Sequence, residues 1–446
     1  MGSLTVVYPS QALEKFVIQG GVPLSGEITA AGNKNAALPI LAACLLTEED
    51  VVLRNVPRIR DTEAQIAILA KLGVEVEWLG DNDLRLCAAA VGGTAVDEDL
   101  AARIRASFLL AGPLLARFGE VRMPPPGGDT IGRRRLDPHL DAFRNLGATV
   151  TGSRMIELQA AGGLTACEIF MDEPSVMGTE NALLAAALTP GKTLIANSAS
   201  EPHVQDLAHL LTRMGATVEG IGSNVMIVHG RDKLGGAEYE IGPDHIEIGS
   251  FMALAAATGG ELRIRDVEPG DLLMIRRQFQ RLGLQSLVEG RDLLVPADQQ
   301  LAVRDDLGDA IPKIDDGPWP AFPADLTSIA LALATQASGT ILIFEKMFEN
   351  RLFFTDKLVA MGARITLCDP HRAIVNGPCR LHGERLESPD IRAGMAMLIA
   401  ALAAEGTSEI GNIVQIDRGY ERIDERLRGL GARVERVAND PVPASL

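Results

Sequence analysis

Amphipathic helical stretches alternate with strand-like stretches along this chain, and six of the junctions between them share one short phrase. The phrase is an apolar residue, a glycine and a second apolar residue, with its glycines at Gly73, Gly147, Gly215, Gly283, Gly362 and Gly431. Neighbouring copies lie 68 to 79 residues apart. Apolar residues recur at helical spacing before each copy and alternate with polar ones after it. Each copy therefore predicts a helix closed by glycine and then a strand.

The residues between two copies indicate a repeating unit of helix, strand, helix, strand and strand. Residues 180–188 form an Ala-rich helical stretch, residues 193–196 an apolar strand and residues 204–214 a second helix. Small residues on the first helix predict that it is buried among other helices, with sheets outside. The same order recurs around residues 248–284, 325–363 and 391–432. Six units of this kind predict an α/β protein with two domains of three units each.

The domain boundaries follow from where the first and fourth units begin. A strand at 16–18 precedes the first helix, which starts near Lys34, and the fourth unit starts near Asp244. We expect the chain to begin in one domain, cross to the other and return. The first domain is then 34–243, the second is 1–33 plus 244–437, and a two-stranded hinge joins them. Residues 438–446 carry proline without periodicity, which predicts a frayed tail.

Composition narrows the class of partner. The chain has 446 residues and a formal net charge of −17, which disfavours nucleic acid and anionic membranes as partners. No apolar run reaches the length of a membrane span and the N-terminus lacks a signal pattern, so we expect a cytoplasmic protein. The five cysteines are scattered without CxxC spacing, which predicts reduced, buried thiols. No ligand-spaced histidine cluster suggests a metal, and we expect no cofactor.

Cationic residues recur where loops lead into predicted helices. A helix N-terminus with a fixed cation binds phosphate or carboxylate, although a single surface arginine more often caps a helix or pairs with an acid. These segments are 32–35, 105–107, 127–135, 349–351, 390–392 and 417–420.

The most unusual local segment is 124–135, with three prolines, three glycines, Asp129 and three consecutive arginines. It matches neither the GxxxxGK[ST] nor the GxGxxG nucleotide pattern. One interpretation is a long exposed turn. The other is a mobile lid that carries Asp129 as an acid beside an anion-binding arginine group.

Four of these segments closely resemble the enolpyruvyl transferases, in the branch that acts on UDP-N-acetylglucosamine. They are Gly32-Asn33-Lys34-Asn35-Ala36-Ala37-Leu38-Pro39, the Pro-Gly-Gly-x-x-Ile-Gly loop, Phe348-Glu349-Asn350-Arg351 and Asp417-Arg418-Gly419-Tyr420-Glu421-Arg422-Ile423. The resemblance runs from about Phe16 to Val437. It implies a two-domain inside-out α/β barrel of six βαβαββ repeats, three per domain.

The resemblance also implies the substrates and the residues that bind them. Phosphoenolpyruvate would be bound at the interdomain hinge by Lys34, Asn35, Arg134, Arg351, Arg392 and Arg418. UDP-N-acetylglucosamine would be bound by Arg105, Arg134, Arg135, Leu136, Asp137, Pro138, Asp325 and Met347. Catalytic roles would fall on Lys34, Asp129, Asp325 and Arg418.

The implied reaction is addition followed by elimination, in the first committed step of peptidoglycan precursor synthesis. The sugar 3-hydroxyl attacks C2 of phosphoenolpyruvate while an acid protonates C3, and phosphate then leaves. A base near the hydroxyl and an acid over the enol carbon carry the two proton transfers. Several cations are needed because phosphoenolpyruvate carries up to three negative charges.

The chain departs from the common pattern of the branch at several positions. Most members carry cysteine at the position of Asp129, so thiol chemistry in this loop is excluded. Other unusual positions are Arg135, Pro138, Glu173 and Met177, and they leave open a different nucleotide or nucleotide sugar as the acceptor. A separate alternative is an inactive paralogue that senses a nucleotide sugar.

Overall fold

The computed structural model describes residues 14–438, which divide into two compact units. Unit 1 contains the described residues up to Thr29, the segment Ile246–Asp316 and the described residues from Ala324 onward. Unit 2 contains Ala30–His245 and the short segment Gly317–Pro323. The sequence analysis had placed this last segment in the other domain. The predicted tail 438–446 lies outside the described residues except for Ala438, the last residue of a strand.

Unit 2 contains seven α-helices and three sheets among its described residues. Its helices are α1 (Lys34–Ala43), α2 (Arg60–Leu72), α3 (Glu98–Ala101), α4 (Ala111–Phe118), α5 (Asp137–Asn145), α6 (Val176–Ala187) and α7 (Pro202–Arg213), with 3₁₀ turns η1 (Cys44–Leu46) and η2 (Arg105–Leu110). Its strands, in sheet order, are β13 (Ala237–Glu240), β3 (Val51–Arg54), β5 (Leu84–Cys87) and β4 (Glu75–Trp78); β9 (Glu168–Phe170), β10 (Gly191–Ala196), β12 (Val225–Gly230) and β11 (Thr217–Glu219); and β6 (Glu120–Met123), β8 (Ile156–Gln159) and β7 (Thr149–Thr151).

Unit 1 also contains three sheets, and its helix α8 begins at the last residue of unit 2. Its helices are α8 (His245–Thr258), α9 (Leu273–Gln280), α10 (Thr327–Ala334), α11 (Thr355–Ala360), α12 (Ile391–Ala403) and α13 (Ile423–Gly429), with η3 (Pro269–Leu272), η4 (Ala324–Leu326) and η5 (Ile413–Arg418). Its strands, in sheet order, are β2 (Gly26–Thr29), β14 (Leu262–Arg265), β16 (Asp292–Val295) and β15 (Leu287–Glu289); β17 (Lys313–Asp315), β18 (Gly339–Phe344), β20 (Arg372–Gly377) and β19 (Ile365–Asp369); and β21 (Arg385–Glu387), β22 (Thr407–Gly411), β1 (Glu14–Gln19) and β23 (Arg433–Ala438).

The four-stranded sheets share one pattern of pairing. In each of them an outer strand runs parallel to its neighbour, and the remaining pairs are antiparallel. The three-stranded sheet lacks this outer strand, but Ala95 forms a single parallel bridge to Arg122 at the same place. The chain therefore folds into a mixed α/β structure built from similar sheets, as the recurring phrase predicts.

The six phrase glycines end helices as predicted. Each has a positive φ between 87° and 113°, the left-handed conformation that glycine adopts most readily. They follow α2, α5, α7, α9, α11 and α13, and they precede β4, β7, β11, β15, β19 and β23. Each of these strands lies at the edge of its sheet. The helix–glycine–strand prediction is confirmed at all six positions.

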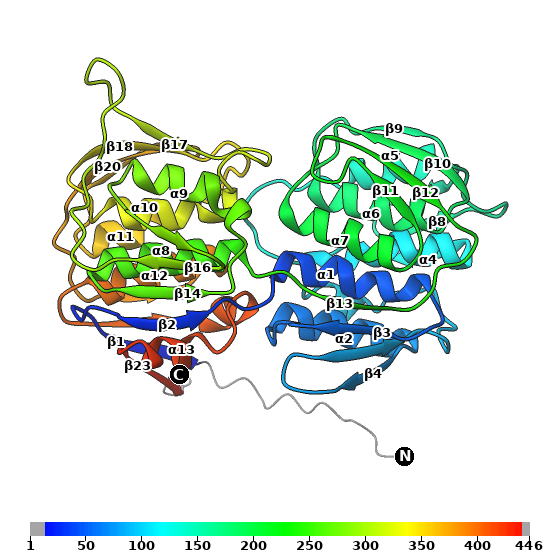
Figure 1. Cartoon of the computed structure of the whole chain (residues 1–446), viewed down its shortest axis with the longest axis horizontal. Helices are drawn as coiled ribbons and strands as arrows, with labels where there is room; N and C mark the ends of the chain where they lie inside the picture. Colours follow the sequence, from blue (N-terminus) through cyan, green and yellow to red (C-terminus); the bar gives the residue numbers. More distant parts are fainter. Residues whose placement is uncertain (1–13, 439–446) are drawn as a thin grey trace, which may run out of the picture. The chain divides into compact units, whose positions relative to one another are not determined.

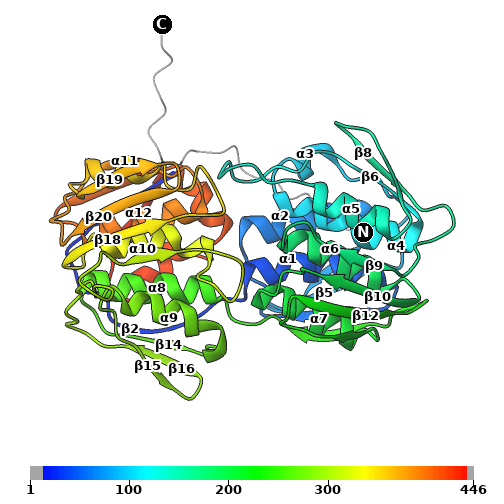
Figure 2. The same cartoon turned by 90° about the horizontal axis from the view of Figure 1, so that it is seen from above.

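The Ala-rich helices form the interior of each unit. All residues of α10 are buried, as are residues 178–187 of α6 and 391–402 of α12. In unit 1, α10 and α12 lie between the sheet that contains β18 and the sheet that contains β14 (Figure 1). In unit 2, α4 and α6 lie between the strands β6 and β8 and the strands β10 and β12 (Figure 2). Within residues 14–438, no helix has both the length and the apolar character that a bilayer crossing requires.

The cysteines are free, and the prediction that all are buried is wrong for three of them. Cys44 and Cys379 are buried, Cys87 and Cys167 are half-buried, and Cys368 is exposed on β19. Burial raises the pKa of the Cys44 and Cys167 thiols, because it disfavours the thiolate. Cys368 is exposed on β19, the edge strand of its sheet, where its neighbour Leu367 is exposed as well.

Candidate active site

In unit 2, the two chain segments that connect the units pair with each other in front of α1. Gly32 forms a bridge with Pro243, and the Asn33 amide donates to the Gly242 carbonyl at 2.8 Å. A Cβ at Gly32 would lie 1.8 Å from the Asn55 carbonyl oxygen, so only glycine allows this close approach. The pairing fixes the position at which α1 begins.

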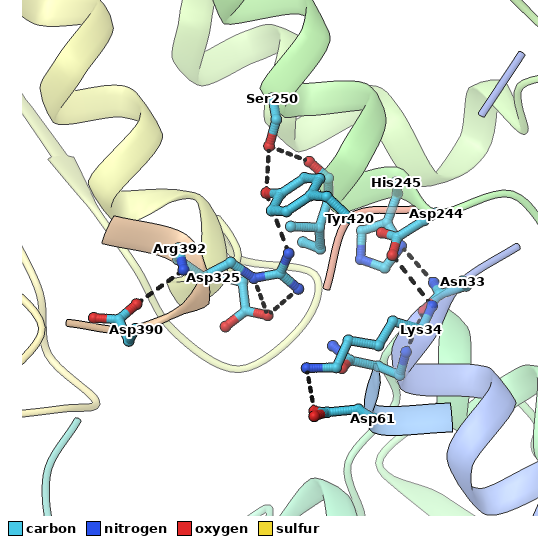
Figure 3. Close-up of polar contacts among 12 residues, drawn as sticks. Asn33, Lys34, Asp61, Asp244, His245, Ser250, Asp325, Asp390, Arg392 and Tyr420 are labelled. Carbon is cyan, nitrogen blue, oxygen red and sulfur yellow. Dashed lines mark hydrogen bonds and ion pairs between the residues drawn. The ribbon is translucent and has the colours of Figure 1, made fainter. Parts of the chain in front are cut away.

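The N-terminus of α1 is capped by Asn33. Its Oδ1 accepts hydrogen bonds from the Asn35 and Ala36 amides at 2.9 and 3.2 Å. Its Nδ2 lies 3.1 Å from Nδ1 of His245, and the Lys34 amide donates to Oδ2 of Asp244 at 3.2 Å. The first turn of the helix is therefore held by side chains from both connecting segments (Figure 3).

Lys34 points from this helix end toward Asp61 on α2, and the Nζ–Oδ2 distance is 2.9 Å. Both side chains are largely buried, with exposed fractions of 10% and 6%. An ammonium group at the positive end of a helix dipole attracts an anion strongly where little water is present. The sequence analysis identified Lys34, but it gave no role to Asp61, because the pair depends on how α1 packs against α2.

Two arginines hold the loop 124–135: Arg105 lies outside the loop, and Arg134 belongs to it. Nη2 of Arg105 donates to the Arg134 carbonyl at 2.6 Å, and Nη2 of Arg134 donates to the Asp129 carbonyl at 2.7 Å. Burial and the charge of Arg134 lower the pKa of Arg105 to about 10. A Cβ at Gly128, whose φ is +104°, would lie 2.9 Å from Cβ of Arg105. Gly128 therefore allows Arg105, Asp129 and Arg134 to lie close together.

The end of the loop leads into the N-terminus of α5. Arg135 forms ion pairs with Asp172 at 3.0 Å, Asp137 at 3.2 Å and Glu173 at 3.8 Å. Asp172 and Asp137 raise the pKa of Arg135, with the Asp172 hydrogen bond as the largest cause. The remaining predicted nucleotide residues are Leu136, which precedes α5, and Pro138, which is buried in its first turn. The unusual residues Arg135 and Glu173 are thus in direct contact.

In unit 1, Asp325 joins two buried arginines. Its Oδ1 accepts from Nη2 of Arg351 at 3.0 Å, and its Oδ2 accepts from Arg392 at 2.8 Å (Nη2) and 3.0 Å (Nε). Arg351 and Arg392 are 2% and 4% exposed. Burial disfavours the charged form of Arg351, but the neighbouring acids, Asp325 foremost, raise its pKa above the usual value. Asp325 therefore bridges two guanidinium groups, and Glu345 and Asp390 are further acids that act on Arg351.

Asp325 itself lies in η4, one residue before the N-cap position of α10. The N-cap residue is Leu326, and no side chain caps this helix. The Asp325 carboxylate is held between arginines from two other segments of unit 1.

The arginine group continues to Tyr420 and Ser250. The Tyr420 hydroxyl lies 3.2 Å from Nη1 of Arg392 and 3.0 Å from Oγ of Ser250 (Figure 3). Asp390 caps α12 by accepting from the Arg392 and Ala393 amides at 2.8 and 2.9 Å. Arg392 is thus oriented through both its backbone and its side chain. Tyr420 lies in a motif that the sequence analysis singled out, but its contact with Arg392 could not be read from spacing.

Arg418 and Met347 complete the predicted residues of unit 1. Arg418 ends η5, and its Nη1 donates to Oε1 of Gln415 at 2.8 Å. Met347 is 38% exposed, and its amide donates to Oε1 of Glu345 at 3.3 Å. Glu345 is fully buried and was not predicted. Among residues 14–438, no three His, Cys, Asp or Glu side chains gather as they would around a metal ion.

A sequence model of one protein family matches nearly the whole chain. It is EPSP synthase (3-phosphoshikimate 1-carboxyvinyltransferase), and it matches residues 18–427. The chain belongs to the enolpyruvyl transferase family. The match includes Lys34, the loop 124–135, Asp325 and Arg418, so the candidate residues of both units fall inside the family region.

Curated relatives place the chain more narrowly within the family. UDP-N-acetylglucosamine 1-carboxyvinyltransferase of Bradyrhizobium diazoefficiens is 57% identical over 423 residues, which cover 95% of this chain and 98% of the relative. The protein of the same name from Treponema denticola is 53% identical and covers 95% of this chain and 99% of the relative. These relatives and the chain are alike over almost their full lengths.

Solved structures of enolpyruvyl transferases share the fold. The enolpyruvyl transferase NikO from Streptomyces tendae matches 96% of this chain and 100% of its own, with a TM-score of 0.84 and 25% identity. EPSP synthase from Acinetobacter baumannii matches 95% of this chain with a TM-score of 0.73 and 18% identity. The match to this EPSP synthase shows a shared fold alone. Identity is much higher to the relatives named for UDP-N-acetylglucosamine than to this EPSP synthase.

Proposed function

We propose that this enzyme transfers the enolpyruvyl group of phosphoenolpyruvate to the 3-hydroxyl of UDP-N-acetylglucosamine and releases phosphate. The observation that carries the proposal is the Asp325–Arg351–Arg392 group, in a chain 57% identical to a UDP-N-acetylglucosamine 1-carboxyvinyltransferase. A carboxylate beside two buried cations suits a reaction that deprotonates a hydroxyl next to an anionic substrate. The product serves peptidoglycan precursor synthesis, where the relatives' reaction is the first committed step.

The cationic residues of the two units are assigned to phosphoenolpyruvate. Lys34 and Asn35 lie at the N-terminus of α1, where backbone amides and the helix dipole favour phosphate. Arg351, Arg392 and Arg418 in unit 1, with Arg134 in the loop of unit 2, would neutralise the remaining charge. Cations gathered around the substrate would stabilise the anionic tetrahedral intermediate.

The proton transfers are assigned to two aspartates. Asp325 would accept the proton of the sugar 3-hydroxyl as C2 of phosphoenolpyruvate is attacked. Asp129, on the loop held by Arg105 and Arg134, would protonate C3. Elimination then returns a proton from C3, breaks the C2–O bond to phosphate and restores the vinyl group. Lys34 and Arg418 would stabilise the departing phosphate.

The nucleotide sugar is assigned to the segment from Arg105 through Arg134, Arg135 and 136–138, with Met347 as a further contact. This assignment is supported by the hydrogen bonds from Arg105 to the backbone of the loop. We also infer that each sheet with its helices is one βαβαββ repeat of an inside-out α/β barrel. The shared sheet pattern and the six helix-ending glycines support this inference.

A second candidate is transfer to a different nucleotide sugar. It is favoured by Arg135, whose guanidinium is engaged by Asp172, Asp137 and Glu173 beside the proposed nucleotide site. Such a cluster of acids alters the local charge at the proposed binding site of the diphosphate. A panel of nucleotide sugars separates the two candidates, with phosphate release as the readout. Rapid release with UDP-N-acetylglucosamine supports the first candidate, and release only with another acceptor supports the second.

A further inference from the structure

Behind Arg351, the carboxyl groups of Asp316 and Glu345 are buried together without a hydrogen-bond donor for all of their oxygens. Asp316 follows β17, Glu345 follows β18, and their exposed fractions are 2% and 0%. Oε1 of Glu345 accepts from the Phe348 amide at 3.1 Å, and Oδ1 of Asp316 accepts from the Lys346 amide at 2.5 Å. If both groups are ionised, their other oxygens, Oε2 of Glu345 and Oδ2 of Asp316, have no hydrogen-bond donor among residues 14–438.

A single proton between the two groups removes both deficits. Two buried carboxylates in contact cannot both ionise without a large energetic cost, so one of them retains a proton and donates it to the other. The distance from Oε2 of Glu345 to Nε of Arg351 is 3.6 Å, and neither atom has a hydrogen-bond partner. A charged carboxylate and a guanidinium, both buried, would approach to about 2.7–2.9 Å. The longer distance fits a neutral Glu345.

We propose that Asp316 and Glu345 share one proton beneath Arg351, and that this proton leaves the Arg351 guanidinium free to act with Asp325 on the anionic substrate. The two acids are positioning residues, since they act through Arg351 and do not contact the substrate themselves. The inference deepens the proposed function, because it assumes that Arg351 binds phosphoenolpyruvate.

The charges around Glu345 agree with this arrangement. Burial raises the pKa of Glu345 to about 8, the charge of Arg351 opposes the rise, and Asp316 adds to it. The neighbouring ionisable groups come from several segments, and they are Asp316, Lys346, Arg351, His371 and, on the far side of Arg351, Asp325 and Asp390. Lys346 pairs with Asp315, and Nδ1 of His371 lies 2.7 Å from the Glu345 backbone carbonyl oxygen. Neither contacts the Glu345 carboxyl group.

Deprotonation of Glu345 is expected to weaken substrate binding. The new charge would draw Nε of Arg351 toward Oε2 and offset the charge that the guanidinium offers to the substrate. If only the protonated form binds well, the KM for phosphoenolpyruvate rises by about tenfold for each pH unit above the pKa. The value of kcat should change less, because the acid pair does not contact the reacting atoms.

The kinetic test compares pH profiles of the KM for phosphoenolpyruvate in four full-length proteins. Glu345→Gln mimics the protonated acid and should hold the low KM from pH 7 to pH 9.5. Asp316→Asn removes the partner that helps to keep the proton, so the rise should begin at a lower pH than in the unmodified enzyme. Asp315→Asn is the matched control, because Asp315 precedes Asp316 but pairs with Lys313 and Lys346 outside the acid pair. It should follow the unmodified enzyme.

The second test measures the proton without activity. The folded-state pKa of Glu345 lies above its unfolded value of about 4.3, so the folded protein retains a proton that the unfolded chain releases. Stability must then fall as pH rises from about 4.3 to about 8, and this contribution is constant above pH 8. The thermal midpoint of Glu345→Gln minus that of the unmodified enzyme should therefore grow between pH 5 and pH 8. Asp316→Asn should end this growth at a lower pH.

Three outcomes decide the matter. An alkaline rise in KM that persists unchanged in Glu345→Gln overturns the inference, as does a midpoint difference that is flat between pH 5 and pH 8. If Glu345→Gln does not fold, an Asp316→Asn profile identical to that of Asp315→Asn overturns it as well. Absence of any phosphate release by the unmodified enzyme overturns the proposed function instead, and the thermal test still decides whether the proton is shared.

Discussion

In the proposed function, Asp325 is the general base, and it lies beside two arginines that are assigned to phosphoenolpyruvate. Its carboxylate accepts three hydrogen bonds from Arg351 and Arg392, which fix its orientation. An amide in its place accepts hydrogen bonds equally well at one oxygen, but it cannot accept a proton from a sugar hydroxyl. A substitution of Asp325 by asparagine therefore separates the loss of proton transfer from a loss of hydrogen bonding.

We predict that Asp325→Asn lowers turnover by about 10²- to 10⁴-fold, the usual loss when a general base is removed. Phosphate release at saturating substrates measures it, and a cooperative thermal transition shows that the variant is folded. Asp356→Asn is the matched control, because this exposed acid of the same unit pairs only with its neighbour Lys357 in the described contacts. Near-normal turnover of Asp325→Asn would leave Asp325 with a purely structural role.

For single residues, the sequence predicted which residues belong to the site better than it predicted which residues contact one another. Lys34, Arg351 and Arg392 stood out because they belong to recognisable motifs at helix starts. Asp61 and Glu345 did not, since each becomes meaningful only when another element packs against it. Tyr420 belongs to a motif, but its contact with Arg392 was not predicted. A buried acid in an otherwise apolar or mixed segment is the signal that a sequence offers in such cases, and Glu345 after the apolar strand β18 is an instance.

The element that we propose to bind phosphate is α1, and Asn33 caps its start. Replacement of Asn33 by alanine removes the oxygen that caps two backbone amides and the contact with His245. We predict a loss of about 0.5–2 kcal/mol in the free energy of unfolding, measured by urea denaturation. The KM for phosphoenolpyruvate should rise in the same variant, because the first turn that presents Lys34 becomes mobile.

Asn33→Ser is the control for this prediction. A serine hydroxyl caps helix ends about as well as asparagine, so most of the stability should return. The serine side chain is too short to replace the contact with His245, and comparison of the two variants separates that contact from the cap. Equal stability of the alanine variant and the unmodified enzyme would show that the cap contributes nothing to α1.

The loop 124–135 carries a prediction about inhibition. Fosfomycin is an epoxide that, in the resembling enzymes, alkylates a cysteine at the position of Asp129, and a carboxylate is a much weaker nucleophile than a thiolate. We predict no covalent adduct on the unmodified chain and one adduct on Asp129→Cys. Intact-mass measurement after incubation with fosfomycin and UDP-N-acetylglucosamine checks both.

The cysteines that the chain does contain serve as the internal control. Cys368 is exposed, and it lies on β19 of unit 1, away from the loop in sequence and in fold unit. An adduct on the unmodified protein, located by peptide mapping, would show that another thiol reacts. No adduct on Asp129→Cys would show that the loop is aligned wrongly with the family pattern.

The sequence was most informative about helices and strands. A glycine after an amphipathic helix has a local cause, because only the left-handed conformation ends the helix and starts the strand. All six copies therefore appeared where they were predicted. The pairing of Asp325 with two arginines could not be predicted from local pattern, since these arginines lie 26 and 67 residues further along the chain.

For the whole molecule, the sequence indicated that the chain begins in one unit, enters the other and returns. It did not indicate that residues 317–323 join unit 2. This segment has neither helical nor strand periodicity, and its place depends on contacts of Trp319 with Glu201, Ser200 and His245. The local pattern of apolar and polar residues does not indicate such contacts between distant segments.

The assignment of cations in both units to one substrate predicts a change in the dimensions of the molecule. Phosphoenolpyruvate bound by Lys34 and by Arg392 would draw the units together, because each attraction strengthens as water leaves. Small-angle scattering should show a smaller radius of gyration with UDP-N-acetylglucosamine and phosphate, as an unreactive anion, than without ligands. An unchanged radius at saturating ligand concentrations would contradict the shared assignment.

The central claim is the identity of the bond that the enzyme forms, and carbon NMR of the product tests it directly. Phosphoenolpyruvate labelled with ¹³C at C2 is incubated with UDP-N-acetylglucosamine and the enzyme. The account predicts that the label appears in a vinyl ether attached to the sugar 3-oxygen, with one equivalent of inorganic phosphate released. Label that remains in phosphoenolpyruvate or appears as pyruvate, with UDP-N-acetylglucosamine unchanged, would contradict it.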